Sequence, residues 1–542
     1  MDDFSNGVSS GLLQPRARRP VKSQLIRKIQ DEGLKPDEHL QSASGISSGT
    51  VTPIPTDAPP SVKATSTARR QIRAQQKRLF PTIQYAARVS HFDPNSDYRD
   101  FRGFFVLFWI SLTIMVITAM LRSYRETGLP LVLSQWSVLT ENIYELALSD
   151  LLMAASTSLS LPLHRLYMNS SLFRWKRGGM LVQILFQAAW LSHWLAWPFV
   201  RTWTWTAQVF FTLHLLSLAM KMHSYAFYNG HLSETYRRLN DLDKPETASK
   251  AAATRYPSPH TRIQELEDDG SDGASSKQSN EDVSQLRDDL ACELTSPLGR
   301  VTYPQNLTFA NYLDFLFCPT LCYELEYPRT AHRRYIELFW KSLAVFGCIF
   351  LLTITSEEFI IPVLDESAVA MLASHALVDR ALILAETISR LLFPFMVTFL
   401  LVFLVIFEYL LGAFAEITCF ADRHFYADWW NSCDWLEFSR EWNIPVHHWF
   451  RRHVYSASRG HLSRPVATVI TFLISALLHE LVMGCITKKL RGYGFFMMMM
   501  QMPIVTVQRS KWMRGKKLLN NVLFWWSMIL GLSMMCALYV LV

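Results

Sequence analysis

Apolar residues of this 542-residue chain gather in long runs that polar stretches separate. Most of the runs are about 20 residues or longer, the length at which an α-helix crosses the hydrocarbon core of a bilayer. Nine runs are present, at residues 103–121, 144–163, 178–199, 203–226, 338–363, 380–419, 465–486, 492–507 and 519–542. The pattern predicts an all-α fold, a polytopic bundle of about nine transmembrane helices.

The sixth run, at 380–419, is too long for one simple span, and Pro394 interrupts it. Proline lacks a backbone N–H and kinks or ends a helix. The sequence leaves two interpretations open at this point, one tilted and kinked helix or two helical segments.

Two polar stretches organise the rest of the chain. Residues 1–95 are rich in Ser, Thr, Pro, Gln and Arg, and predict a disordered cytosolic tail that ends in a basic juxtamembrane segment. Spans 1–4 lie within 96–229, a cytosolic loop with an acidic, disordered insert occupies 230–337, and 338–542 carries spans 5–9. We expect the tail and the insert, 240–295, to be dispensable for chemistry.

Charge near the ends of the runs predicts the topology. With the basic tail inside the cell, the positive-inside rule places 230–337 and 420–464 in the cytosol. Lys488, Lys489 and Arg491 then fall on the far side, against the rule. Whether the seventh and eighth runs cross the membrane fully is left open.

Composition removes several classes of protein from consideration. Half of the residues are hydrophobic and 18% are charged, which is not the balance of a soluble chain of this length. The eight cysteines include no C-x-x-C pair, and the H-E-L-V-M sequence that begins at His479 lacks the second histidine of a zinc motif. We expect no metal site, no bound cofactor and no nucleic-acid partner.

His479 and Glu480 lie inside the seventh apolar run, T-F-L-I-S-A-L-L-H-E-L-V-M-G. Burying an imidazole and a carboxylate in a membrane is unfavourable, so such groups face a cavity or a partner and usually serve function. Ser475 precedes His479 by four residues and shares its helical face. A histidine satisfied by a neighbouring helix is the plainer alternative.

The segment 420–464 mixes Trp, Phe, His and Arg, and its aromatic rings suit the headgroup level of a membrane. Its most concentrated part is F-Y-A-D-W-W-N, residues 425–431, which we call the heptad. A surface helix anchored by Trp and Arg is one interpretation of the segment. An amide beside paired tryptophans, at Asn431, is also able to position a polar reactant.

The heptad resembles the F-Y-x-D-W-W-N signature of the membrane-bound O-acyltransferase superfamily, in the branch of sterol and diacylglycerol O-acyltransferases. W-N-I-P-V-H at 442–447, R-H-V-Y at 452–455 and the His-Glu pair at 479–480 follow in the order of that branch. The long tail, K-K-L-R-G-Y at 488–493, Q-M-P at 501–503 and a C-terminus inside an apolar run are similar to fungal sterol O-acyltransferases.

This resemblance implies an enzyme of the endoplasmic reticulum membrane that transfers a long-chain acyl group from acyl-coenzyme A to a sterol 3-hydroxyl. The products would be steryl esters for storage in lipid droplets. It also implies a homodimer or higher homo-oligomer, with acyl-coenzyme A as a co-substrate and not a cofactor. Diacylglycerol is the alternative acceptor. A transporter is the alternative from another class, but the chain has no pair of matching halves.

By the same resemblance, His479 is the general base that takes the hydroxyl proton. Asn431 holds or polarises the thioester carbonyl. The remaining candidates for substrate binding are Phe425, Tyr426, Asp428, Trp429, Trp430, Ser475, His447 and Arg440. Arg440 belongs to a group of basic residues suited to the phosphates of coenzyme A, together with Arg451, Arg452, Arg459 and Arg464.

Overall fold

The computed structural model describes residues 80–83, 85–93, 96, 102–131, 134–170, 173–243, 289–297 and 299–542. All of them belong to one unit of the chain, Lys77–Val542. The described residues form helices joined by loops, with isolated β-bridges as their only strand-like pairing. Most of the predicted tail, and the predicted acidic insert between 244 and 288, lie outside the described residues.

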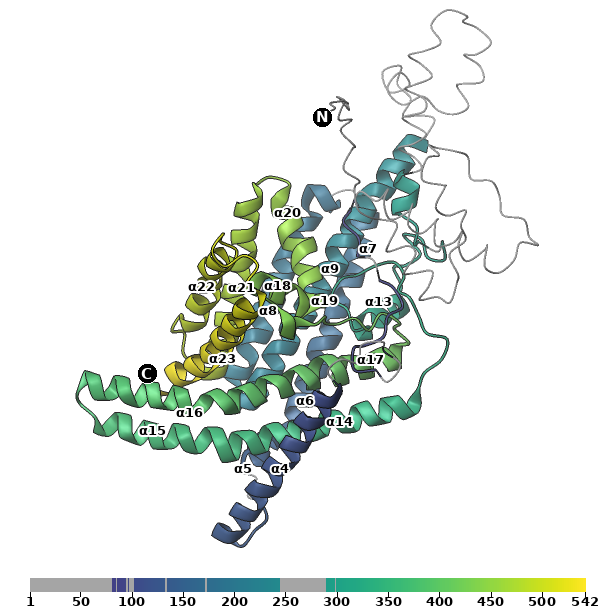
Figure 1. Cartoon of the computed structure of the whole chain (residues 1–542). Coiled ribbons are helices and arrows are strands. Elements are labelled where there is room, and N and C mark those ends of the chain that lie inside the picture. The colour runs from purple at the N-terminus through teal and green to yellow at the C-terminus, as the bar shows by residue number, and fades with distance from the viewer. Residues whose placement is uncertain are drawn as a thin grey trace, which may run out of the picture. The chain divides into compact units, whose positions relative to one another are not determined.

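The N-terminal half contains α4 (Arg102–Thr127), α5 (Ser134–Thr140), α6 (Ile143–Ser156), α7 (Ser160–Asn169), α8 (Met180–Val200), α9 (Trp205–Asp243) and α13 (Phe309–Phe317). The C-terminal half contains α14 (Tyr335–Thr355), α15 (Ile361–Ala373), α16 (Leu377–Phe403), α17 (Leu411–Thr418), α18 (Trp435–Glu441), α19 (Ile444–Trp449), α20 (Ser456–Arg459), α21 (Arg464–Thr487), α22 (Tyr493–Gln508) and α23 (Lys517–Leu541) (Figure 1).

Every predicted apolar run coincides with a helix or a continuous series of helices, and the all-α class is confirmed. Six of these helical segments are long and apolar enough to cross a membrane, within residues 103–127, 143–169, 335–373, 377–418, 464–487 and 517–541 of the described chain. The count of nine spans is therefore not confirmed. The eighth run forms α22, whose 16 residues measure about 24 Å, less than the hydrocarbon core.

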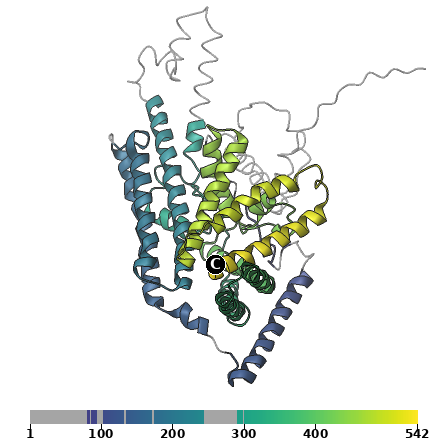
Figure 2. The ribbon, with the colours of Figure 1, turned by 90° about the vertical axis from the view of Figure 1, so that its left-hand side faces the viewer.

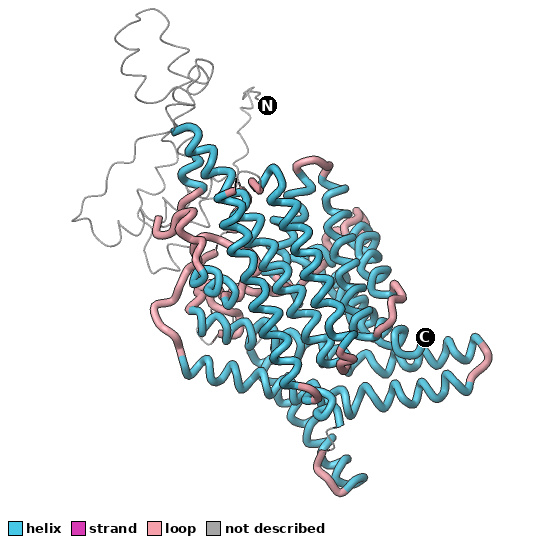
Figure 3. Tube along the Cα trace, turned by 180° about the vertical axis from the view of Figure 1, so that it is seen from behind, coloured by secondary structure: helices cyan, strands magenta, loops and turns pink. Residues whose placement is uncertain are grey.

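The sixth run forms one continuous helical segment, Leu377–Thr418, and not two separate ones. Pro394 lies inside α16, and a π-helical turn, η6 (Leu404–Leu410), joins α16 to α17. The segment runs beside the equally long series α14–α15, as the tube of Figure 3 also shows. A π turn widens the helix locally and often marks a functional position.

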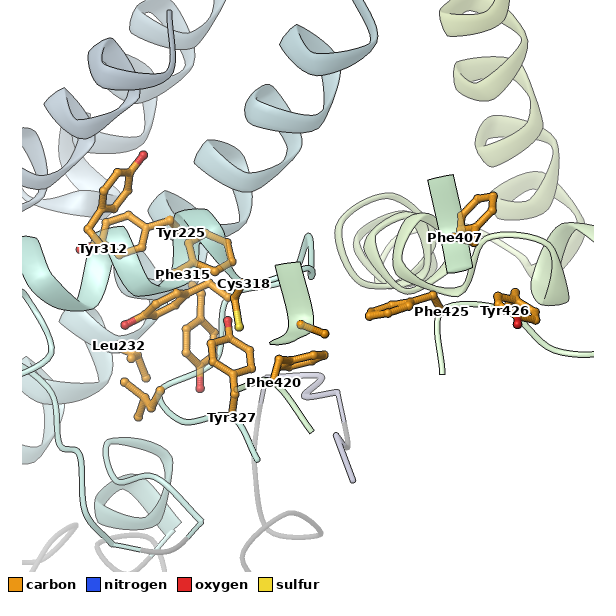
Figure 4. Packing of buried hydrophobic residues seen from close by; sticks show 14 of the residues in the cluster. Tyr225, Leu232, Tyr312, Phe315, Cys318, Tyr327, Phe407, Phe420, Phe425 and Tyr426 are labelled. Carbon is orange, nitrogen blue, oxygen red and sulfur yellow. The ribbon is translucent and has the colours of Figure 1, made fainter. Parts of the chain in front are cut away.

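The largest buried cluster lies where the loops after α9 and α17 meet the helices. Its aromatic members include residues of α9, α13, η6 and the heptad, and Figure 4 shows Tyr225, Tyr312, Phe315, Phe407, Phe425 and Tyr426 among them. Much of the predicted cytosolic loop, residues 299–330, contributes to this core, and α9 continues to Asp243. These parts of the predicted 230–337 loop are therefore structured.

Residues 85–93, which we call the strap, also pack against this core although they fall inside the predicted disordered tail. The Arg88 guanidinium donates to both carboxylate oxygens of Asp422, at 3.0 and 2.7 Å. Backbone bonds join Arg88 to Ala421 and Arg423, at 3.0 and 2.9 Å. The prediction of a disordered tail does not hold for the strap, because its polar groups find partners more than 300 residues away.

Candidate active site

His479 lies in the C-terminal half of α21, eight residues before the helix ends. More than a third of the surface of His479 is accessible. The expectation that this histidine faces a cavity stays a prediction.

One hydrogen bond fixes the form of the imidazole. Nδ1 of His479 lies 2.7 Å from the backbone oxygen of Ser475. A carbonyl oxygen can only accept, so Nδ1 carries the proton and Nε2 keeps its lone pair. Ser475 therefore contacts His479 through its backbone and not through its hydroxyl.

Glu480, the next residue, anchors the turn between α21 and α22. Its carboxylate accepts backbone N–H bonds from Arg491, Gly492 and Phe495 at 3.2, 2.7 and 3.1 Å. The Tyr539 hydroxyl at the end of α23 donates a fourth bond at 2.7 Å. Glu480 thus ties α21, α22 and α23 together directly behind His479.

Three heptad residues are buried and belong to the core. Phe425, Tyr426 and Trp429 are 3%, 1% and 1% exposed, so none of them is placed to touch a substrate from the accessible side. Phe425 and Tyr426 point in opposite directions from the extended backbone (Figure 4). The Trp429 ring packs edge-on against Phe399 and Trp442.

A buried polar network holds Tyr426. Its hydroxyl donates to Glu408 at 3.0 Å and lies 2.9 Å from the Ser90 hydroxyl of the strap. Ser90 also donates to Glu408, and the Lys341 ammonium from α14 lies 2.9 Å from the same carboxylate. Sequence analysis missed Glu408 and Lys341, although charged residues inside apolar runs are the signal that singled out His479.

The other heptad residues, Asp428, Trp430 and Asn431, keep accessible surface. Asn431 donates from its backbone N–H to the Asp428 carbonyl at 2.9 Å, which closes the short η7 turn (Trp429–Asn431). Asn521 of α23 binds the carbonyls on either side of Asn431, at 3.0 and 2.9 Å. Trp525 binds the first of these carbonyls at 3.1 Å, so the position of Asn431 is fixed by α23.

Asn431 and His479 are held at opposite ends of α23. Asn521, next to Asn431, stands near the beginning of the helix, and Tyr539, the partner of Glu480, stands near its end. These two contacts are eighteen residues apart, about 27 Å at 1.5 Å per residue. The two groups assigned to catalysis are therefore not neighbours, and only an elongated ligand is able to reach both.

Three histidines of the segment 420–464 have pKa values well below the usual value and are therefore neutral near pH 7. Burial lowers the pKa of His424, His447 and His448 to about 4 each. Nearby arginines, Arg440 and Arg451 for His447, lower this pKa further by charge repulsion. His447 is half-buried in α19, which Asn443 caps by accepting the Val446 N–H at 3.1 Å.

The basic residues divide into two groups. Arg440, Arg451 and Arg464 are exposed and make no side-chain ion pair with any described residue. Arg452, by contrast, is buried, pairs with Glu324 at 3.0 Å and lies 4.6 and 4.7 Å from the ring centroids of Phe80 and Tyr228. Arg452 therefore stabilises the buried core through its ion pair and ring contacts. The expectation that it attracts coenzyme phosphates is not supported.

The described residues contain no group of three or more His, Cys, Asp or Glu side chains that could hold a metal ion. The groups that remain for chemistry are the imidazole, the exposed arginines and the accessible heptad positions.

The chain belongs to the membrane-bound O-acyltransferase family, whose model matches residues 186–541. It is 40% identical to a probable sterol O-acyltransferase 2 of Schizosaccharomyces pombe, over 82% of this chain and 87% of the relative. It is 33% identical to sterol O-acyltransferase 2 of Candida albicans, over 85% and 78%. Similarity to diacylglycerol O-acyltransferase 1 of Dictyostelium discoideum is 34% but covers only 45% and 38%.

Proposed function

We propose that this chain is an acyl-coenzyme A-dependent sterol O-acyltransferase that forms steryl esters. The observation that carries this proposal is the similarity to fungal sterol O-acyltransferases over most of both chains. The form and placement of the His479 imidazole agree with it, because esterifying a sterol needs a base in a space that an apolar acceptor can reach.

His479 acts as the general base in this proposal. The sterol oxygen attacks the thioester carbonyl while its proton passes to Nε2, the nitrogen that the Ser475 carbonyl leaves unprotonated. The carbon–sulfur bond then breaks, and the imidazolium returns its proton to the departing thiolate. The carbonyl of Ser475 stabilises the imidazolium in between, because it accepts from Nδ1 throughout.

Asn431 takes part on the coenzyme side of the thioester. Asn521, which binds the backbone beside Asn431, and Tyr539, which binds Glu480 beside His479, are about 27 Å apart along α23. This separation favours contact of Asn431 with the pantetheine arm over contact with the reacting carbonyl. Long-chain acyl-coenzyme A is an elongated molecule that suits two such separated points. Asp428 and Trp430 are accessible beside Asn431 and line the same approach.

The two substrates arrive by different routes. The coenzyme phosphates come from the aqueous side, where the exposed guanidinium groups of Arg440, Arg451 and Arg464 attract them. The sterol is soluble in the membrane and reaches the internal space between helices. We further propose an endoplasmic reticulum location and a homodimer or higher homo-oligomer, as the family resemblance implies.

Diacylglycerol is the second candidate acceptor, supported by the partial similarity to the Dictyostelium enzyme. A competition assay separates the two. The purified protein is given long-chain acyl-coenzyme A with equal amounts of an ergosterol-type sterol and diacylglycerol, and the labelled products are resolved. We expect mainly steryl ester. Predominant triacylglycerol would overturn the sterol assignment, and no ester of either kind would overturn the proposed activity.

A further inference from the structure

A cavity of about 590 Å³ lies apart from the site described above. It is bounded by the second half of α9, the turn that precedes α8, and the start of α20. Trp175, Met180 and Phe227 form its apolar wall, and Lys176 and Arg238 are among its basic lining residues. No residue of the heptad or of α21 lines it. It is therefore separate from the heptad and from the helix that carries His479.

The position of the cavity along α9 favours the level of lipid headgroups. α9 is not among the six segments of the described chain that are long and apolar enough to cross a membrane, but it contains most of the apolar run 203–226, and the cavity lies at the more polar end that follows this run. The 39 residues of α9 measure about 58 Å, more than a hydrocarbon core of about 30 Å. The cavity uses residues 223–238 of this helix, together with the basic W-K-R-G-G turn before α8. By the positive-inside rule this is the cytosolic interface. Figure 2 shows α8 and α9 beside the helices that follow α20.

The charge of the cavity is positive at its rim. Lys176 and Arg238 form no ion pair with any residue that the structure describes. One carboxylate, Glu234, faces them and accepts a long hydrogen bond of 3.5 Å from the Lys176 backbone N–H. The other acidic and basic groups nearby are already paired, since His231 contacts Glu293 and Arg452 contacts Glu324.

The inner wall offers no further charge. Burial lowers the pKa of His453 to about 2, so this ring is neutral, and its Nε2 lies 3.0 Å from the Ser224 hydroxyl. The His223 ring stacks on Phe227 with centroids 4.0 Å apart. A ligand that matches this cavity carries an anionic group at one end and an apolar part at the other.

We propose that this cavity binds an anionic glycerophospholipid of the cytosolic leaflet. Its phosphate lies between Lys176 and Arg238, and the upper part of its acyl chains contacts Trp175, Met180 and Phe227. Basic residues near a membrane surface attract anionic lipids, and aromatic rings favour the same depth. The bound lipid would connect α8 and α9 to α20, which immediately precedes the helix that carries His479.

The test measures lipid binding directly. Purified protein in a neutral detergent is titrated with phosphatidylinositol or phosphatidylcholine, and bound lipid is counted by native mass spectrometry. Wild type should retain phosphatidylinositol in a saturable, one-to-one manner and retain phosphatidylcholine at least about fivefold less well. Each basic residue is expected to contribute about fivefold to the affinity for an anionic lipid. The double variant Lys176→Gln with Arg238→Gln should therefore weaken phosphatidylinositol binding by at least about tenfold.

Two further variants make the test specific. Ala457→Trp adds a ring to the exposed lining of the cavity and should exclude the lipid while both basic residues stay in place. Lys511→Gln with Arg514→Gln removes two exposed charges from the α22–α23 connection and should leave binding unchanged. Equal binding in all proteins would overturn the proposal. It would also be overturned if the Lys176/Arg238 variant kept its lipid but raised the KM for acyl-coenzyme A, because the cavity would then belong to the coenzyme.

Discussion

At the scale of single residues, the sequence singled out His479 within an apolar run, but it could not show how the imidazole is protonated. That depends on a 2.7 Å contact with the Ser475 carbonyl, which a helical period alone does not reveal. The heptad could be recognised from its letters. Its division into buried Phe425, Tyr426 and Trp429 and accessible Asp428, Trp430 and Asn431 depends on tertiary packing.

Asn431→Ala is the residue-scale prediction. If Asn431 contacts the coenzyme side of the substrate, its loss should raise the KM for acyl-coenzyme A by about tenfold and change kcat less, because a ground-state hydrogen bond is removed. Steady-state kinetics with acyl-coenzyme A varied at saturating sterol measure both constants. If kcat instead fell by about a hundredfold or more while KM stayed unchanged, Asn431 would stabilise the reacting carbonyl directly.

At the scale of elements, hydropathy located every long helix because burial in lipid demands a continuous apolar run. The strap was not predicted as a structured segment, because it is polar and its sequence shows no hydrophobic periodicity. Its contacts are separate hydrogen bonds, from Arg88 to Asp422 and from Ser90 to Glu408, and residues far apart in sequence give no local signal for them.

Truncation distinguishes the strap from the remainder of the predicted tail. A chain that begins at residue 80 should keep turnover within a few-fold of wild type, whereas a chain that begins at residue 96 should lose most activity and melt at a lower temperature. The reason is that removing Ser90 and Arg88 leaves buried Glu408 and Asp422 with fewer donors. Arg88→Ala with Ser90→Ala in the full-length chain should reproduce the loss. Equal activity of both truncated chains would contradict the role of the strap.

Glu480→Gln tests the element behind His479. The carboxylate accepts four hydrogen bonds, whereas an amide offers one acceptor oxygen. The free energy of unfolding should therefore fall by about 1–3 kcal/mol, and the apparent melting temperature should fall with it. Tyr539→Phe removes only one of the four donors and should have a smaller effect in thermal unfolding. The account of the turn fails if the two variants are equally stable or if the order is reversed.

At the scale of the whole molecule, the described residues unite six apolar helical segments with a cap whose core is aromatic. We use the word cap for loop residues 299–330 together with the segment 420–464. The sequence predicted both parts and the family, but not that loop residues 299–330 complete the cap, because buried loops hold few apolar runs. The sequence also left open whether the eighth run crosses the membrane. This run forms α22, which is shorter than the hydrocarbon core.

Acid should weaken the cap. His424 and His448 are half-buried in the neutral form with pKa values of about 4, whereas the unfolded chain binds their protons below about 6.5. Stability is therefore present above about pH 6.5 and lost as the pH falls toward 4. The apparent melting temperature should fall between about pH 7 and pH 5, and less steeply in His424→Gln with His448→Gln. An identical slope in both proteins would contradict these assignments.

The central claim is that this chain transfers an acyl group to a sterol with His479 as the base. The direct measurement is single-turnover formation of steryl ester from labelled acyl-coenzyme A by wild type, His479→Ala and the control His375→Ala, which changes an exposed histidine between α15 and α16. We predict that His479→Ala keeps its oligomer size and melting temperature while its rate falls by at least about a hundredfold, and that the control matches wild type. A well-folded His479→Ala protein within a few-fold of the wild-type rate would contradict the account.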